Sequence, residues 1–202
     1  MRLLPTTTFS ARLASPPTET ELPTSELLLD GEPTGLMVTG AILQAAVEWH
    51  DYRIAFFTDD IPYEDMLRIY MFDLDMALVD AAVLGAMYST GTFDALTLQP
   101  PDRLTFRFFG GTVWRMVLLA EPEFALPFVS DPRGVSRKFK LSRQFRIEGK
   151  PQPEEVRAVS PRREKAARIQ VATSLPRRAP RRRKPKKNNE RTLHLQPVPA
   201  PG

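Results

Sequence analysis

The sequence predicts an all-β protein, an antiparallel β-sandwich of about seven to nine strands with a disordered N-terminal arm and a basic C-terminal tail. Three observations favour this fold class. Apolar and polar residues alternate with a period of two along many short runs between residues 25 and 149. Turn-forming residues separate these runs, and no long helical pattern lies between them. Both ends of the chain are rich in Pro and polar residues, which is typical of segments that build no core.

The chain divides into three parts. Residues 1–24 are rich in Thr, Pro and Ser without periodicity, and we expect a disordered arm. Residues 25–149 hold almost all the aromatic and β-branched residues and form the sandwich domain. Residues 150–202 form a basic, mostly disordered tail, in which Pro161 at a first helical position predicts a short helix over 161–171.

About eight or nine candidate strands follow one another in the domain. They lie near residues 27–30, 36–49, 52–58, 66–72, 78–84, 93–98, 104–109, 112–119 and 137–147. The regions 40–50 and 78–88 are rich in Ala and also fit a helix, but their neighbours are strands, so we assign both to strands. A small α+β domain with a helix near 40–50 is the alternative. The expected core between two sheets contains Trp49 or Trp114, Phe106 and Phe108.

The clearest local pattern is a hairpin around Gly110-Gly111. Two β-rich runs flank this pair, and two glycines supply the positive φ angles that a two-residue hairpin turn needs. Such a turn would place Phe108 opposite Val113 on one side of the hairpin. On the other side Arg107 would lie opposite Trp114, where a guanidinium can stack on the indole.

A second clear pattern is the half-buried strand expected over 137–147. One face carries Phe139, Leu141, Phe145 and Ile147, interrupted by Arg143, and the other carries Lys138, Lys140, Gln144 and Arg146. Because the strand ends the domain, we expect an edge strand with a basic outer face, where lysines also discourage unwanted pairing.

The composition excludes several classes of site. The chain has no Cys and only two His, so disulfides, thiolate nucleophiles and Cys-based metal sites are excluded. We expect no cofactor, no bound metal and no catalytic residue. No apolar run approaches the ~18–20 residues that a membrane helix needs, so we expect no membrane insertion and a cytoplasmic location.

Charge is divided unevenly along the chain. Residues 25–132 hold 17 acids and 5 bases, whereas 133–149 hold 6 bases and 1 acid. Residues 150–202 hold 15 bases and 4 acids. An acidic body followed by a strongly basic end indicates an interaction tail that meets a polyanion, or one that meets the acidic body of its own or another copy.

The tail sequence "LPRRAPRRRKPKKNNER" carries the strongest functional signal. Basic runs bind phosphates by charge and counterion release, with little sequence discrimination. We therefore expect nucleic acid or another polyanion as the ligand. The run lacks interleaved aromatic residues, so we expect no base stacking on the tail itself. The predicted polyanion-binding residues are Arg177, Arg178, Arg181, Arg182, Arg183, Lys184, Lys186 and Lys187 of the tail, with Lys138 and Lys140 of the edge strand.

The stretch "YMFDLDMALVD", residues 70–80, resembles the first motif of the haloacid dehalogenase-like hydrolases, an apolar strand that runs into Asp-x-Asp. The resemblance implies Asp73 as a nucleophile, Asp75 as an acid/base and a bound Mg²⁺. It covers about ten residues and departs from the family where Met76 and Ala77 stand in place of Gly and Thr. The other interpretation, which we prefer, is a hairpin turn between two strands.

The carboxylates of this turn and of the loop before it suggest an acidic surface. If the two lie at one end of the sandwich, they form a rim that can dock a basic partner, including the tail. The predicted acidic rim is Asp59, Asp60, Glu64, Asp65, Asp73 and Asp75.

Three functions follow as hypotheses. The first is a non-catalytic interaction or assembly module, in which the β-sandwich contacts a protein partner and the polybasic tail binds a polyanion. The second is a divergent phosphohydrolase using Asp73 and Asp75. The third is a structural protein of a larger particle, and self-association into a homo-oligomer is left open in each.

Overall fold

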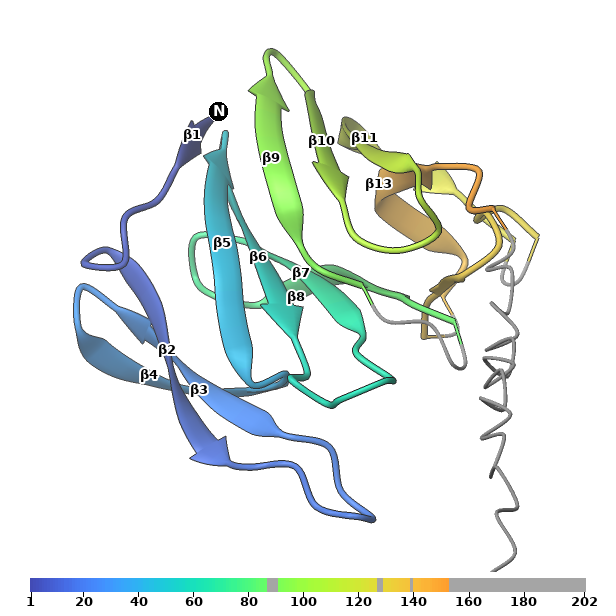
Figure 1. The fold of residues 1–202 in the computed structure, drawn as a ribbon. Helices are drawn as coiled ribbons and strands as arrows, with labels where there is room; N and C mark the ends of the chain where they lie inside the picture. Colours follow the sequence, from blue (N-terminus) through green and yellow to red (C-terminus); the bar gives the residue numbers. More distant parts are fainter. Residues whose placement is uncertain (87–90, 127–128, 139, 153–202) are drawn as a thin grey trace, which may run out of the picture. The chain divides into compact units, whose positions relative to one another are not determined.

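The computed structural model describes residues 1–86, 91–126, 129–138 and 140–152, all within the first of two compact units, Met1–Arg157. These residues form thirteen β-strands and no helix, arranged in three antiparallel sheets (Figure 1). The all-β sandwich prediction is confirmed, and the α+β alternative is wrong because 42–49 is a strand. No helix that could cross a bilayer occurs in the described residues. The predicted tail beyond residue 152, with its helix over 161–171, lies outside them.

The largest of the three sheets, the central sheet, has six strands and is flanked by one sheet on each face. Its order is β1 (Arg2–Leu3), β5 (Ile42–Trp49), β6 (Tyr52–Thr58), β7 (Leu67–Phe72), β8 (Leu78–Leu84) and β12 (Val135–Ser136). The N-terminal sheet has the order β2 (Phe9–Ser15), β3 (Thr24–Leu29) and β4 (Glu32–Thr39). The C-terminal sheet has the order β13 (Ser142–Glu148), β11 (Val113–Phe124), β10 (Arg103–Arg107) and β9 (Asp94–Gln99).

Two hydrophobic cores lie on the two faces of the central sheet. In β6, Ile54 and Phe56 point into the core shared with the C-terminal sheet, whereas Ala55 and Phe57 point into the core shared with the N-terminal sheet. All four are fully buried. This explains why "IAFF" lacks polar alternation, since a strand covered on both faces reads as a continuous apolar run.

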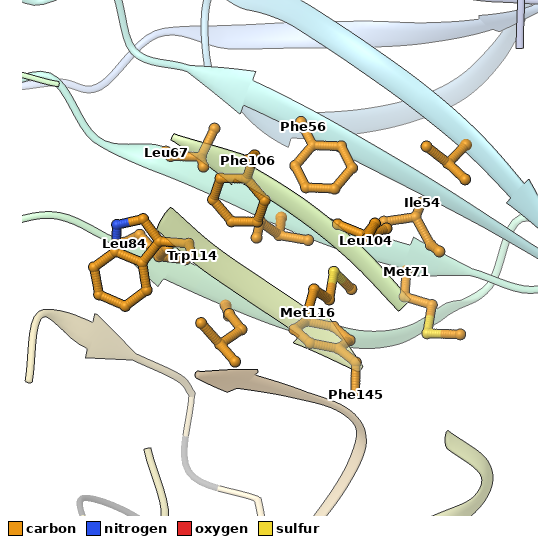
Figure 2. Close-up of a cluster of buried hydrophobic side chains, with 14 of the residues drawn as sticks. Ile54, Phe56, Leu67, Met71, Leu84, Leu104, Phe106, Trp114, Met116 and Phe145 are labelled. Atoms are coloured by element: carbon orange, nitrogen blue, oxygen red, sulfur yellow. The ribbon is translucent and has the colours of Figure 1, made fainter. Parts of the chain in front are cut away.

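The larger core confirms the predicted core residues. Trp49, Trp114, Phe106 and Phe108 all belong to it, and their exposed fractions are 3%, 0%, 0% and 8%. Figure 2 shows Phe56 beside Phe106, with Trp114, Met116 and Phe145 extending the cluster. The Phe56 and Phe106 rings meet edge to face with centroids 5.7 Å apart, a preferred aromatic geometry.

The first 24 residues are not the disordered arm that their composition predicts. Strand β2 pairs with β3, and β1 pairs with β5. Leu4 and Phe9 are buried in the core against the central sheet, with exposed fractions of 7% and 1%. Burial of these two apolar side chains helps to offset the conformational entropy that is lost when the segment becomes ordered. The average composition of the segment, rich in Thr, Pro and Ser, does not reveal their contribution.

The Gly110-Gly111 hairpin forms with a register one residue away from the prediction. Phe106 lies opposite Trp114 and Arg107 opposite Val113, so the connection is longer than a two-residue turn. The observed register places Phe106 and Trp114 on one face, where both are fully buried, whereas the predicted one would set Trp114 opposite a charged residue. Core packing therefore overrides the local turn preference.

The last predicted strand is shorter than expected. Strand β13 starts at Ser142 and is an edge of its sheet, as predicted. Lys138 and Lys140 precede it, so the prediction that they line its outer face is wrong. Arg143 and Gln144 are both buried, with exposed fractions of 8% and 4%. Arg143 can be buried because it donates hydrogen bonds to a backbone carbonyl and to a carboxylate, which a simple alternation pattern does not anticipate.

Candidate functional site

A cavity of about 480 Å³ lies beside the first half of β8, and most of the basic stretch 133–143 converges on it. Its size is within the ~300–1,000 Å³ range of small-ligand pockets. Apolar residues, among them Leu78 and Leu126, complete its wall. We name this cavity the cationic pocket, because five cations and only two carboxylates line it: Arg133, Arg137, Lys138, Lys140 and Arg143 with Asp80 and Asp131.

Arg137 is the fixed cation of the pocket. Its Nη1 donates to Asp80 Oδ1 at 2.9 Å, its Nε to Asp131 Oδ2 at 3.0 Å and its Nη2 to the Phe145 carbonyl at 3.0 Å. The guanidinium also lies 4.3 Å from the centre of the Phe145 ring. A planar guanidinium with three anchors keeps one orientation, and two of these anchors are carboxylates that offset its charge, so Arg137 has a structural role in the pocket wall.

Asp80 connects the central sheet to the C-terminal sheet. It is 6% exposed, and besides Arg137 it accepts the backbone N–H of Gln144 on Oδ2 at 2.7 Å. Its Oδ1 also accepts the backbone N–H of the next residue, Ala81, at 2.8 Å. Charge-assisted hydrogen bonds of this kind are the strong ones, so Asp80 holds the two walls of the pocket together.

Arg143 is a second buried cation in the wall of the pocket. Its side chain is 9% exposed and donates to the Ser130 carbonyl and to Glu123 Oε1, both at 3.0 Å. The hydrogen bond from Arg143 to Glu123 and, to a lesser extent, the positive charge of Arg143 lower the pKa of Glu123 below its usual value. Arg143 Nε and Asp131 Oδ1 have no hydrogen-bond partner in the described part of the chain, although Asp131 Oδ1 lies 3.8 Å from Arg143 Nη1, within ion-pair distance. Both atoms are fully buried, so they belong to the packed wall of the pocket and not to its open volume.

The remaining cations lie at the surface of the pocket. Lys140 donates to the Val79 carbonyl at 2.7 Å, whereas Arg133 and Lys138 are exposed and form no ion pair within the described residues. An excess of one sign of charge in a concave site raises the local concentration of ligands of the opposite sign.

A second cavity of about 500 Å³ adjoins the first. It lies between β4 and the face of β7 and β8 that the N-terminal sheet leaves uncovered. The Tyr70 hydroxyl donates to the Thr39 carbonyl at 2.8 Å, and both residues line the cavity. Burial raises the pKa of Tyr70 above its usual value. Leu78, Ala81, Ser136, Arg137 and Lys138 line both cavities, so the two form neighbouring sites along β8.

The predicted acidic rim does not form. The loop that holds Asp59 to Asp65 precedes β7 and the turn that holds Asp73 and Asp75 follows it, so the two lie at opposite ends of that strand. Asp59 is fully buried and pairs through both oxygens with Arg68, at 2.6 and 2.7 Å. Sequence distance alone had suggested one cluster, but a six-residue strand separates the two groups.

The acidic loop has a structural role of its own. Asp65 Oδ1 accepts the backbone N–H groups of Asp59 and Asp60, at 2.9 and 3.0 Å. Burial raises the pKa of Asp65 above its usual value, and the two backbone hydrogen bonds oppose that shift. Burial by itself would lower the pKa of Arg68, but its hydrogen bonds to Asp59 and the charge of that carboxylate raise it overall. Asp60 and Glu64 are exposed.

The interpretation of Asp73 to Met76 as a hairpin turn is confirmed. The Asp73 carboxylate accepts the Ala77 N–H at 2.8 Å, and the Asp73 carbonyl accepts the Met76 N–H at 3.1 Å. Met76 adopts a φ of 64°, the left-handed conformation that a tight turn requires. No group of three or more potential metal-ligating side chains gathers anywhere in the described ranges.

Two of the predicted polyanion-binding residues, Lys138 and Lys140, lie at the cationic pocket, and the predicted tail residues from Arg177 to Lys187 lie outside the described residues. Sequence reasoning missed Arg137, Arg143 and Asp80, although the density of bases over 133–143 was a visible signal. Comparisons with protein-family models, with curated proteins and with solved structures find no match to this chain.

Proposed function

We propose that this chain is a non-catalytic interaction module that assembles with an anionic partner. The cationic pocket of the β-sandwich and the polybasic stretch 177–187 provide the positive charge, and nucleic acid is the simplest polyanion for them to meet. A cytoplasmic location belongs to the same proposal. The observation that carries it is the convergence of five cations on one pocket, in a body whose residues 25–132 hold 17 acids and 5 bases.

The charge arrangement supports this proposal in two ways. The excess of acids elsewhere in the body disfavours polyanion contact there, so the pocket is the favoured contact surface of the described residues. Arg133 and Lys138 have exposed side chains without ion-pair partners in the described residues, so they can contact phosphates at little desolvation cost.

The tail adds positive charge to that of the pocket. Screening limits electrostatic attraction to about 8 Å at physiological salt, so a fixed pocket acts only at short range. Nine closely spaced Lys and Arg residues occur in the sequence from Arg177 to Arg191, and basic runs of this kind release condensed counterions when they bind phosphates. The tail would supply most of the affinity, and the pocket would fix the register of the bound strand.

A salt titration of nucleic-acid binding tests the proposal. The probe is fluorescein-labelled oligothymidylate, and its anisotropy is followed with the full-length protein over a series of salt concentrations. A tail variant replaces the eight predicted tail residues by Gln, and a pocket variant is Lys138→Gln with Lys140→Gln. The control is Arg115→Gln, because Arg115 is exposed and lies on β11, outside the pocket lining.

Each lost phosphate contact on single-stranded DNA lowers the slope of log K against log salt by about 0.7. The pocket variant should therefore lose about 1.4 from the slope, the tail variant more, and the control almost nothing. Equal, salt-insensitive binding by the wild type and all three variants would contradict the proposal.

A further inference from the structure

Strand β8 has an open edge inside the folded body. It runs over seven residues, but β12 pairs only with its last two, Val83 and Leu84. In the described residues no strand pairs with the outer side of 78–82. The cationic pocket lies along this open stretch, since Leu78, Val79, Asp80 and Ala81 form one of its walls. An unpaired strand edge is a ready template for pairing with another chain.

Side chains occupy the backbone groups of this edge. Lys140 Nζ donates to the Val79 carbonyl at 2.7 Å, and the Ala81 N–H donates to Asp80 Oδ1 at 2.8 Å. Val79 is the extra residue at the register shift between β7 and β8, and its carbonyl is the edge acceptor that the Lys140 contact identifies. An exposed lysine can leave its carbonyl at small cost, because it exchanges one accessible hydrogen bond for another.

The walls of the pocket specify the kind of partner. Leu78 and Leu126 line it and are exposed by 52% and 51%, which leaves two large apolar side chains open beside the strand edge. Arg133 and Lys138 supply unpaired positive charge on the same cavity. A partner strand that alternates apolar and acidic residues would cover the leucines with one face and neutralise the cations with the other.

We propose that the open edge of β8 pairs with an extended segment of a partner protein in which acidic residues alternate with apolar ones. The inference deepens the proposed function and rests on its interaction-module part, because it names the surface and the class of protein partner. The backbone N–H groups of that segment donate to the Val79 carbonyl, and Lys140 turns to one of its carboxylates. Two copies of this chain paired edge to edge would bring two cationic pockets together, so a second copy fits this edge poorly.

A labelled peptide and one protein variant test strand pairing directly. The probe is a fluorescein-labelled peptide of alternating Glu and Val residues with blocked ends, added to full-length ¹⁵N-labelled protein. Two control peptides replace Glu by Lys, or carry N-methyl groups on alternate amides of the Glu–Val sequence. The protein variant is Val79→Pro, which changes the edge backbone at the register shift of β8, a position where a proline can be accommodated, and circular dichroism establishes that it folds.

The Glu–Val peptide should move the amide signals of residues 78–82. It should also bind at least about tenfold more tightly than either control peptide, and Val79→Pro should lose about the same factor. Equal binding of the N-methylated peptide, signal changes confined to other strands, or no binding at all would overturn the inference. So would concentration-dependent dimers of the wild type that Val79→Pro abolishes.

Oligothymidylate binding separates the two proposals. The wild-type protein serves for this comparison, because phosphate contacts need no strand edge whereas strand pairing is read from the peptide. If the peptide fails while the salt-dependent binding of oligothymidylate persists, only the strand-pairing inference falls, whereas loss of oligothymidylate binding in the wild type removes the polyanion function.

Discussion

Replacement of Asp80 by Ala should destabilise the folded body more than any exposed substitution. Asp80 is 6% exposed and accepts three hydrogen bonds, one from the Arg137 guanidinium and two from backbone N–H groups. Removing one partner of a buried ion pair typically costs about 3–5 kcal/mol. Arg137 keeps its hydrogen bonds to Asp131 and to the Phe145 carbonyl, so we expect the lower end, about 3 kcal/mol of the free energy of unfolding.

Urea denaturation followed by tryptophan fluorescence measures this loss, since Trp114 is fully buried and reports on the core. In a domain of this size each kcal/mol corresponds to about 2–4 °C, so the melting temperature should fall by about 6–12 °C. The matched control is Asp75→Ala on the neighbouring turn, where the side chain is exposed and the expected change is within about 0.5 kcal/mol. A cost of less than about 1 kcal/mol for Asp80→Ala, or one equal to the control, would refute the network as described.

A double variant refines the same reasoning. Asp80→Ala with Arg137→Met removes both charges of this pair, and Asp131, the other carboxylate that pairs with Arg137, keeps Arg143 at 3.8 Å. The two losses should therefore not add, and the double variant should be at least about 1 kcal/mol more stable than the sum of the single variants predicts.

Three further outcomes follow from the geometry. The chain has no Cys, and Thr105 lies opposite Arg115, so the double variant Thr105→Cys with Arg115→Cys should form a disulfide in the oxidised protein. If Thr105→Cys forms a disulfide with Met116→Cys and not with Arg115→Cys, the register predicted from the turn is the correct one. The pKa of Tyr70 is raised above 10.0 in the folded protein, so the tyrosine ionises first in the unfolded chain. Its contribution to the free energy of unfolding is therefore fully present below pH 10.0 and is lost as the pH rises through the folded pKa. Urea unfolding below and above pH 10.0 should show a steeper alkaline loss for the wild type than for Tyr70→Phe. A Cβ on Gly149 would lie 2.5 Å from the Trp114 ring, so Gly149→Ala should lower the free energy of unfolding by about 1–3 kcal/mol in the same assay, and no loss there would contradict the packing.

The strands could be predicted from the sequence because a half-buried strand shows its alternation locally. The helix-or-strand ambiguity of 42–49 and 78–84 was resolved correctly by their neighbours. The hairpin register was missed because the Gly110-Gly111 turn is a local signal, whereas burial of Phe106 against Trp114 is a property of the whole core. The order of residues 1–24 depends on Leu4 and Phe9, two side chains in a segment that otherwise resembles a linker.

The sequence indicates the positive charge of the candidate site, but it does not indicate the contacts that build the site. A run of bases at 133–143 is visible in the sequence, and Lys138 and Lys140 were predicted as ligand contacts, although on the outer face of a strand that starts only at Ser142. The hydrogen bond between Arg137 and Asp80 joins residues 57 positions apart, and no local pattern indicates it. The prediction of an acidic rim is wrong for the opposite reason. The two sets of carboxylates are close in the sequence, but the length of β7 separates them in space.

In the proposed function the folded body, and not only the tail, contacts the anionic partner. A ¹H–¹⁵N NMR titration of the full-length protein with oligothymidylate tests this contact most directly, because each backbone amide reports separately. We expect signal changes at Arg133, Lys138 and Lys140, together with those of the tail. Changes confined to residues 153–202, with the signals of the pocket unmoved at saturation, would contradict it.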